Sequence, residues 1–378
     1  MEMFERTMMM ANSFDQYAEE LDIPESRYLE AIKRYESIGS WLSKNDSAIA
    51  KYAPKIYPQG SFCLGTVVKP INNDEYDIDL VCCFENLQKE ETTQGKLKKM
   101  VGDRLLENDV YKRILDKEGN RCWTLNYANE FHLDILPAIA DNELRARLGL
   151  YADAILITDK EKIVAQDQEW PKSNPKGYAK WFSSRQERIF IVMKNALAET
   201  TKVKVDEVPD YKIKTPLQRV VQILKRHRDY YYSKKNNDYK PISIIITTIA
   251  AMLYNGQNNT YNAIHDILLG INDNLLKKTG VGYYIPNPTN PEENFADKWN
   301  DDPKLSQAFY EWVNEARNAF CSESILEKAD SKEFGKALEV SLGMKIPENS
   351  LGREKVSVTM PPYVRSNPSS ERRPWGNG

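Results

Sequence analysis

Histidine, paired cysteine and long apolar runs are scarce in this sequence, and each shortage excludes a class of protein. Three histidines are present and lie far apart in the chain, which disfavours a histidine-rich zinc site. The five cysteines form no CxxC pair and their number is odd, so we expect a reduced, cytoplasmic environment. Metal chemistry must then rest on carboxylates, whose oxygen ligands favour Mg²⁺, with Mn²⁺ as a substitute.

A membrane segment and a surplus of positive charge are also lacking. The longest apolar stretch, Ile242–Leu253, is interrupted by Ser243, Thr247 and Thr248 and is typical of a buried helix, because a membrane span needs roughly 18 apolar residues. The N-terminus has mixed charge and no small-residue cleavage site, so we expect no signal peptide. Lys and Arg number 52 and Asp and Glu 55, for a net charge of −3, which disfavours a dedicated nucleic-acid binder.

The first half of the chain mixes helical and strand-like patterns. Apolar residues at helical spacing between Ser13 and Lys51, interrupted at residues 22–24, predict two N-terminal helices. Shorter alternating runs then predict strands within residues 56–84, where GTVVK precedes YDIDLVCCF, and within residues 121–135. We therefore expect a mixed sheet in this half.

The second half is dominated by helical patterns after about residue 175, and the chain ends in a stretch rich in Pro, Ser, Arg and Asn. The sequence thus predicts an α+β fold with three parts. These are a mixed-sheet lobe that includes the N-terminal helices (residues 1–175), an all-helical lobe (176–350) and a flexible tail (351–378).

The most informative pattern is the aspartate pair in YDIDLV. Side chains alternate along a strand, so Asp77 and Asp79 share one face, roughly 7 Å apart, while Ile78 and Leu80 point into the core. Two carboxylates on one face repel unless positive charge lies between them. A pair of divalent cations roughly 4 Å apart resolves this repulsion. We therefore interpret Asp77 and Asp79 as metal ligands.

A third carboxylate follows on another alternating run, FHLDILP. Phe131, Leu133 and Ile135 alternate with Asp134, so Asp134 points away from the apolar face of its strand. If this strand lies beside the first, three carboxylates converge. Asp134 would then hold the metal that activates an attacking hydroxyl, or take the proton from that hydroxyl.

A Gly-Ser pair upstream suits the phosphate end of a substrate. Gly60 lets the backbone approach a phosphate closely. Ser61, at the start of a predicted helix, offers a hydroxyl and free backbone N–H groups to phosphate oxygens. Each motif alone is a weak signal. Together with the three aspartates, the pattern predicts in-line attack on the α-phosphate of a nucleoside triphosphate, with pyrophosphate leaving.

These motifs resemble those of the bacterial cGAS/DncV-like nucleotidyltransferases (CD-NTases), members of the polymerase-β-like superfamily. The resemblance rests on QGSFCLGTVVKP, EYDIDLVC and FHLDILPAIAD, and extends to TPLQRVVQILKRHRDYYY, KPISIIITTIAAMLY and IPNPTNPEENFADKW, over about residues 13–320. It implies a bilobed enzyme with the active site between the lobes. It also implies that the product is a cyclic di- or trinucleotide that serves as a second messenger in anti-phage defence (CBASS).

Carried over by position, the resemblance assigns the metal-binding and catalytic triad to Asp77, Asp79 and Asp134, with two Mg²⁺ ions. It assigns nucleotide binding to the loop Gln59, Gly60, Ser61 and Phe62, and to Lys225 and Ser243 as contacts of the triphosphate. Two alternatives stay open from the residues themselves. Lys225 with its basic neighbours would otherwise form a solvated charged face, and Ser243 after Pro241 would otherwise be a helix N-cap.

The expected partners are nucleoside triphosphates, ATP among them, with no membrane and no required nucleic acid. The resemblance also implies that a ubiquitin-like ligase conjugates the C-terminal Gly378, against the alternative of an ordinary tail. Two other functions remain: a template-independent transferase acting on RNA or a small acceptor, and a non-catalytic scaffold of the same fold. An RNA acceptor predicts a strong basic patch, and unused buried carboxylates are costly to retain.

Overall fold

The computed structural model of the chain divides into two compact units. The sheet unit comprises Ile23–Trp181 and Asn287–Glu293, and the helical unit comprises Met1–Asp22, Phe182–Pro286 and Asn294–Gly378. The predicted tail from residue 351, including Gly378, and residues 72–74 and 128–130 lie outside the described residues. The described residues are 2–71, 75–127, 131–165, 169–235, 237–322 and 331–345.

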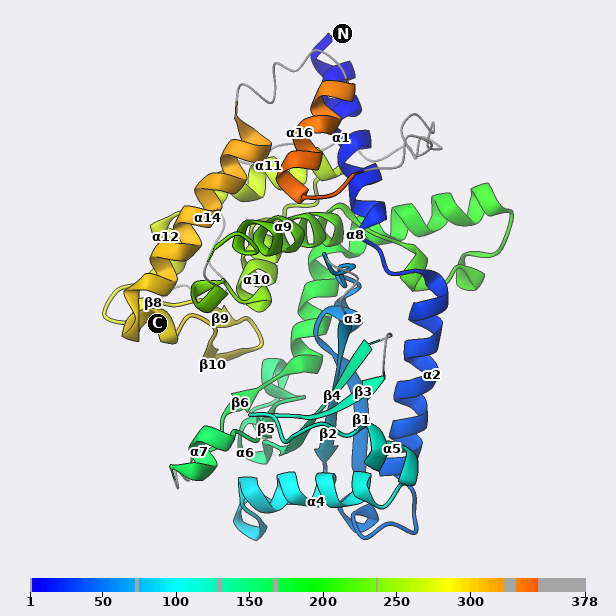
Figure 1. Cartoon of the computed structure of the whole chain (residues 1–378), viewed down its shortest axis with the longest axis vertical. Coiled ribbons are helices and arrows are strands. Elements are labelled where there is room, and N and C mark those ends of the chain that lie inside the picture. The colour runs from blue at the N-terminus through cyan, green and yellow to red at the C-terminus, as the bar shows by residue number, and fades with distance from the viewer. Residues whose placement is uncertain are drawn as a thin grey trace. The chain divides into compact units, whose positions relative to one another are not determined.

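Within its described residues the sheet unit contains a six-stranded mixed sheet of order β1-β2-β4-β5-β6, with β3 also paired to β4 (Figure 1). β2 and β4 run parallel, and the other neighbours run antiparallel. The strands are β1 (Pro54–Gln59), β2 (Tyr76–Phe84), β3 (Trp123–Tyr127), β4 (Phe131–Ala140), β5 (Ile155–Ile157) and β6 (Lys172–Ser173). The helices are α2 (Glu25–Leu42), α3 (Gly60–Leu64), α4 (Gln94–Leu106), α5 (Asp109–Ile114), α6 (Asn142–Arg145) and α7 (Lys160–Val164).

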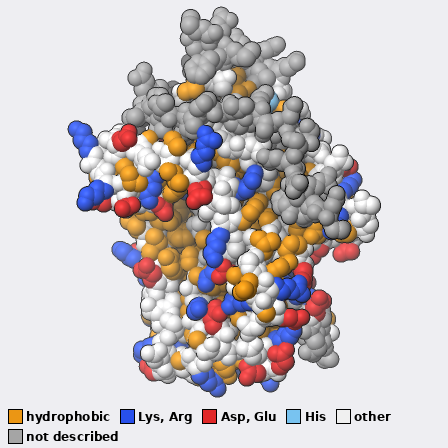
Figure 2. Space-filling model, turned by 180° about the vertical axis from the view of Figure 1, so that it is seen from behind, with side chains coloured by type: hydrophobic (Ala, Val, Ile, Leu, Met, Phe, Trp, Pro, Cys, Tyr) orange, Lys and Arg blue, Asp and Glu red, His pale blue; other side chains and the backbone are white. Residues whose placement is uncertain are grey.

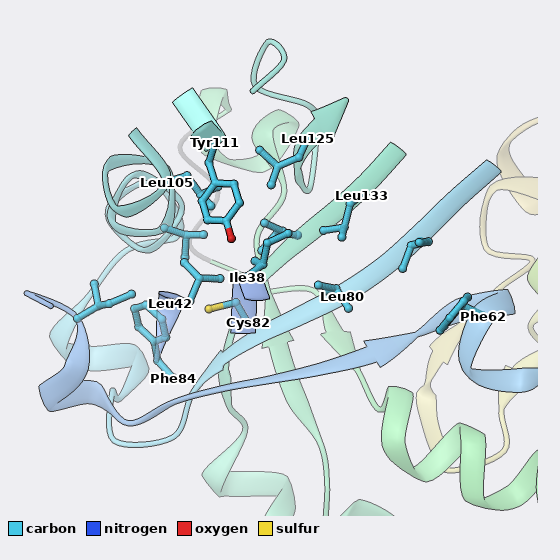
Figure 3. Close-up of a cluster of buried hydrophobic side chains, with 14 of the residues drawn as sticks. Ile38, Leu42, Phe62, Leu80, Cys82, Phe84, Leu105, Tyr111, Leu125 and Leu133 are labelled. Atoms are coloured by element: carbon cyan, nitrogen blue, oxygen red, sulfur yellow. The ribbon is translucent and has the colours of Figure 1, made fainter. Parts of the chain in front are cut away.

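One face of this sheet is buried under helices. Ile78 and Leu80 of β2 are fully buried, as the alternation in YDIDLV predicts. They share a core cluster with side chains of α2, α4 and α5 (Figure 3). The odd-numbered residues of β2 point to the opposite face, where Val81 and Cys83 are buried in a second apolar cluster, and Asp77 and Asp79 make the part near the start of the strand polar. The helices therefore fix the plane of the sheet and leave this polar part of the opposite face, the polar face, for chemistry.

The start of β3 is anchored to α4. The Trp123 indole N–H donates to the carbonyl oxygen of Lys98 at 2.8 Å, and its ring lies against Gly102. The buried Lys98 ammonium donates to the carbonyls of Gly119 and Asn120 just before the strand, at 2.5 and 2.7 Å. Because these contacts come from both main chain and side chain, β3 has a fixed position relative to the helix layer.

The helical unit is built on α9, which lies against α1, α10, α11, α14 and α16. One two-residue hairpin, β7 (Lys277–Lys278) with β8 (Gly282–Tyr283), adds a small departure from the all-helical expectation. None of the described helices is both long and apolar enough to cross a membrane. The helices are α1 (Glu2–Glu20), α8 (Pro175–Thr201, which also enters the sheet unit), α9 (Pro216–Tyr232), α10 (Ser243–Leu253), α11 (Thr260–Gly270), α12 (Asp273–Leu276), α13 (Lys298–Asp301), α14 (Pro303–Cys321) and α16 (Ser331–Leu342). Strands β9 (Pro286–Asn287) and β10 (Asn290–Asn294) form a second short pair, most of which belongs to the sheet unit.

Two local expectations differ from the structure. The segment GTVVK, predicted as a strand, forms no strand in the described residues. Gly65 ends α3 in the left-handed conformation, and the β-branched Thr66 and Val67 are buried without strand pairing. The first helix also differs from the sequence-based boundary, because α1 packs in the helical unit. Phe14 contacts Phe320 and Phe334 there, and the Tyr17 hydroxyl donates to the Gly335 carbonyl at 2.6 Å.

Replacing Gly102 by alanine tests the α4–β3 anchor. A Cβ at this position would lie 2.4 Å from Cζ2 of Trp123, so the indole or the helix must shift. We expect Gly102→Ala to lower the free energy of unfolding by about 1–3 kcal/mol, as overpacked cores do. Urea denaturation followed by circular dichroism measures this. Gly95→Ala on the same helix is the control, since its Cβ would meet Ile163 at an ordinary 3.6 Å; equal losses in both variants would contradict the anchor.

His227 makes stability depend on pH. It is buried on α9, where Trp312 donates its indole N–H to Nδ1 at 3.0 Å, and burial lowers the pKa of His227 to about 4 from 6.5. The unfolded chain therefore binds this proton near pH 6.5, well before the folded chain does. The stabilisation from neutral His227 is fully present above pH 6.5 and is lost as pH falls toward 4, a loss of up to about 3 kcal/mol.

Unfolding curves recorded from pH 7.5 to 4 measure that loss. We expect His227→Gln to flatten the pH dependence, whatever its effect at pH 7.5. His265→Gln, which replaces another histidine of the helical unit, is the control and should retain the wild-type slope. A wild-type slope in His227→Gln would show that other groups produce the pH dependence.

Candidate active site

The register of β2 and β4 brings the predicted aspartates to one region of the polar face. Asp79 is the direct neighbour of Asp134 across the parallel pair, and Asp77 is the neighbour of His132. Asp77 lies one pleat from Asp79 on the same side of β2. The expected adjacency of the two strands, on which a joint site depends, is therefore present.

Asp134 lies in the more enclosed part of this region. The Thr124 hydroxyl of β3 donates to its Oδ1 at 2.5 Å, since the two residues face each other across the antiparallel pair. Burial raises the pKa of the Asp134 carboxyl above its usual range, and the charge of Asp77 adds to this rise, while Thr124 and His132 oppose it. Asp77, by contrast, has a side chain that is 69% exposed. The polar face is thus most exposed at Asp77 and half-buried at Asp134.

The Gly-Ser loop contacts the aspartates directly. β1 ends at Gln59, the strand partner of Asp79, and α3 begins at Gly60. Gly60 has a φ of +61°, and a Cβ there would lie 2.2 Å from Oδ2 of Asp79. Glycine is required on both counts. Ser61 lies directly after Gly60 in the first turn of α3, and Phe62 is buried in the core.

His132 connects two acids at the open end. Its Nε2 lies 2.8 Å from Oε2 of Glu75, and its Nδ1 lies 3.4 Å from Oδ1 of Asp77. These contacts make His132 a structural neighbour of Asp77. Glu75 contacts His132, and His132 contacts Asp77, so Glu75 lies at the edge of the polar face.

The donor set suits a hard divalent cation. Asp77, Asp79 and Asp134 offer carboxylate oxygens alone, the ligands that Mg²⁺ prefers. Among the described residues, no three His, Cys, Asp or Glu side chains already stand close enough to hold an ion together. Asp77 lies against His132 instead, and carboxylates that share no cation repel one another. The three aspartates therefore fit a divalent cation, both by their oxygen ligands and by their positions on the neighbouring strands β2 and β4.

Lys225 and Ser243 belong to the helical unit. Lys225 and Arg228 of α9 are 7% and 5% exposed, so the alternative of a solvated charged face is wrong. Ser243 is the first residue of α10, whose N-cap is Ile242, so the N-cap alternative is also wrong. Its hydroxyl accepts a hydrogen bond from Arg228 Nη1 at 2.9 Å. Their contact with a triphosphate stays a prediction.

Two partners of predicted site residues were missed by the sequence analysis: Thr124, which contacts Asp134, and Arg228, which contacts Ser243. Thr124 was given no role, although it stands on a predicted alternating strand; its partner depends on the pairing of β3 with β4, which no sequence motif encodes. Arg228, which holds Ser243, was grouped with the basic face of its helix. Its signal was present, since it lies three residues after Lys225 on α9.

Comparison with known proteins gives consistent matches. The model of a family described as the Second Messenger Oligonucleotide or Dinucleotide Synthetase (SMODS) domain matches residues 8–186. A c-di-GMP synthase of Roseivirga ehrenbergii is 32% identical over 305 residues, which are 80% of this chain and 76% of that protein. The cyclic dinucleotide synthase CdnG of Bradyrhizobium diazoefficiens is 25% identical over 313 residues, which are 77% of this chain and 70% of that protein.

Solved structures agree in fold. The CD-NTase CdnG of Bradyrhizobium diazoefficiens, in complex with GTP, aligns with a TM-score of 0.64 at 20% identity. The alignment covers 88% of this chain and 98% of that one. At this identity the likeness concerns the fold alone, and it confirms the expected α+β architecture.

Replacing Gly60 by alanine tests the contact between the loop and the triad. Its Cβ would displace the Asp79 carboxylate, so we expect Gly60→Ala to weaken Mn²⁺ binding about 10–100-fold, measured by isothermal titration calorimetry. Gly149→Ala is the matched control. Gly149 has a φ of +60° with no atom near its Cβ, so it carries the same backbone strain of roughly 1–2 kcal/mol without the clash. Equal Mn²⁺ affinity in the two variants would contradict this account.

Proposed function

Because the chain belongs to the SMODS family of second messenger oligonucleotide or dinucleotide synthetases, we propose that Asp77, Asp79 and Asp134 carry out its synthesis. The protein is a nucleotidyltransferase that makes a cyclic dinucleotide. The observation that supports the site assignment is the register of β2 with β4, which makes Asp79 and Asp134 direct neighbours with Asp77 on the same face. The Gly-Ser loop abuts this set through Gly60.

The environments of the three carboxylates suggest different duties. Asp134, enclosed and with a raised pKa, is suited to accept the proton of an attacking ribose hydroxyl. Asp77, exposed at the mouth, and Asp79, beside the loop, are suited to hold the end that bears the triphosphate. Two Mg²⁺ ions, when bound to these carboxylates, supply charge neutralisation for the α-phosphate and the leaving pyrophosphate. The N–H groups at the start of α3 orient phosphate oxygens.

We propose GTP as the substrate and cyclic di-GMP as the product. The relative at 32% identity is a c-di-GMP synthase, and the CdnG structure contains GTP. ATP stays the alternative nucleotide. Lys225 and Ser243 are proposed to contact the triphosphate, with Arg228 holding the serine hydroxyl. A role in anti-phage signalling follows from the resemblance, and conjugation through Gly378 and a cytoplasmic location stay predictions.

Nucleotidyl transfer to RNA is an alternative function that can be judged from the distribution of charge on the surface. An RNA acceptor requires a basic stripe along which the backbone binds. On the face shown in Figure 2, Lys and Arg side chains are interspersed with Asp and Glu over the described surface, and the net charge is −3. A non-catalytic scaffold would have no need for three aspartates on one face of the sheet beside a positive-φ glycine. Both features favour synthesis from nucleotides.

Removing the carboxylates tests the assignment. We expect Asp77→Ala and Asp79→Ala each to lower turnover at least about a hundredfold, since metal-held charge stabilisation is worth several kcal/mol. The measurement is incubation with the four nucleoside triphosphates and Mg²⁺, singly and in pairs, followed by mass spectrometry of the products. Cyclic product from GTP alone supports cyclic di-GMP.

The control is Asp103→Ala, which removes an exposed carboxylate of α4 that pairs with Lys99 on the same helix. A surface pair of this kind contributes little, so turnover should stay at the wild-type level. Wild-type turnover in both Asp77→Ala and Asp79→Ala would refute the site assignment. A linear extension of added RNA would favour the rival transferase.

A further inference from the structure

We propose that Thr124 is a positioning residue for the Asp134 carboxylate, and that its hydroxyl sets the affinity of the triad for its divalent cation. This inference rests on the proposed function of Asp134. It adds a residue on a third strand, β3, to a site that the sequence pattern places on β2 and β4 alone.

Thr124 and Asp134 are joined by a direct hydrogen bond in which the hydroxyl is the donor. Thr124 and Asp134 are opposite residues of the antiparallel β3–β4 pair, so their side chains leave the sheet together on the polar face. The Thr124 hydroxyl donates to Oδ1 of Asp134 at 2.5 Å. An ionised carboxylate only accepts hydrogen bonds, so the hydroxyl proton must point at the acid. Such charge-assisted bonds are short and strong.

This bond limits how the carboxylate rotates. A carboxylate joined to its strand by single bonds turns freely unless one oxygen is held, and Thr124 holds Oδ1. Threonine is branched at Cβ, so its own χ1 rotation is restricted and little freedom is lost when the bond forms. The geometry therefore assigns one Asp134 oxygen to Thr124 and leaves the orientation of the other fixed.

The strand that carries Thr124 is itself held in place. Asp116 N–H donates to the Thr124 carbonyl at 2.9 Å, and the adjacent Trp123 donates to α4 through the Lys98 carbonyl. Lys98 in turn binds the two carbonyls that precede the strand. A residue that orients a metal ligand acts only if its own position is fixed. Thr124 meets this requirement, because its own carbonyl is hydrogen-bonded to Asp116 and the adjacent Trp123 is hydrogen-bonded to α4.

A set of substitutions separates positioning from general stability. Thr124→Val keeps the shape and removes the hydroxyl, and Thr124→Ser keeps the hydroxyl and removes the methyl. Thr158→Val is the matched control, because Thr158 is a fully buried threonine of the same unit whose hydroxyl donates to the Arg121 carbonyl at 3.0 Å. Asp134→Asn is measured in parallel. The readouts are the Mn²⁺ dissociation constant by calorimetry, and kcat and KM for GTP.

We expect Thr124→Val to raise the Mn²⁺ dissociation constant and lower kcat, each about 10–100-fold, with KM for GTP little changed. Thr124→Ser should restore both, and Thr158→Val should match wild type. Wild-type Mn²⁺ affinity in Thr124→Val, no rescue by serine, or an equal loss in Thr158→Val would overturn the proposal. If Asp134→Asn also binds Mn²⁺ and turns over normally, the triad assignment fails; if only Thr124→Val is normal, the positioning role alone fails.

Discussion

Repulsion between carboxylates is the constraint around which the polar face of the sheet is organised. The parallel register of β2 and β4 puts Asp79 beside Asp134, with Asp77 one pleat away. Burial and the charge of Asp77 raise the pKa of Asp134, as expected where acids are brought together out of water. A cation relieves this crowding, and family membership implies metal-dependent chemistry. The three aspartates are thus arranged to bind a cation that the protein must take from solution.

Each neighbour of the acids restricts one of them. Gly60 leaves room for the Asp79 carboxylate that no other residue would leave, Thr124 holds an oxygen of Asp134, and His132 lies against Asp77. These neighbours come from α3, β3 and β4, which the apolar core on the other face of the sheet holds together. The positions of the side chains on the polar face therefore depend on the packing of the apolar core on the other face of the sheet.

Much of this arrangement was predictable from period-two patterns. The alternation in YDIDLV and FHLDILP was enough to put three aspartates on polar faces, and the break at residues 22–24 separated two helices correctly. The pairings were not predictable, because strand register depends on the whole sheet. Hence Thr124 was missed. GTVVK was wrongly predicted as a strand, since its β-branched residues are buried by tertiary packing beyond α3. Arg228 was missed as the partner of Ser243 because their contact joins two helices.

The membership of α1 in the helical unit sets an order of assembly during synthesis. α1 leaves the ribosome before the sheet unit does, yet the Tyr17 hydroxyl donates to a carbonyl 318 residues later, and Phe14 contacts the rings of Phe320 and Phe334. Residues 23–181, by contrast, supply nearly all of the sheet unit in one continuous stretch. The sheet therefore has its strands available early, whereas α1 lacks its partners around Phe320 and Gly335 until the chain has been made through residue 335, although α9 and α11 are available sooner.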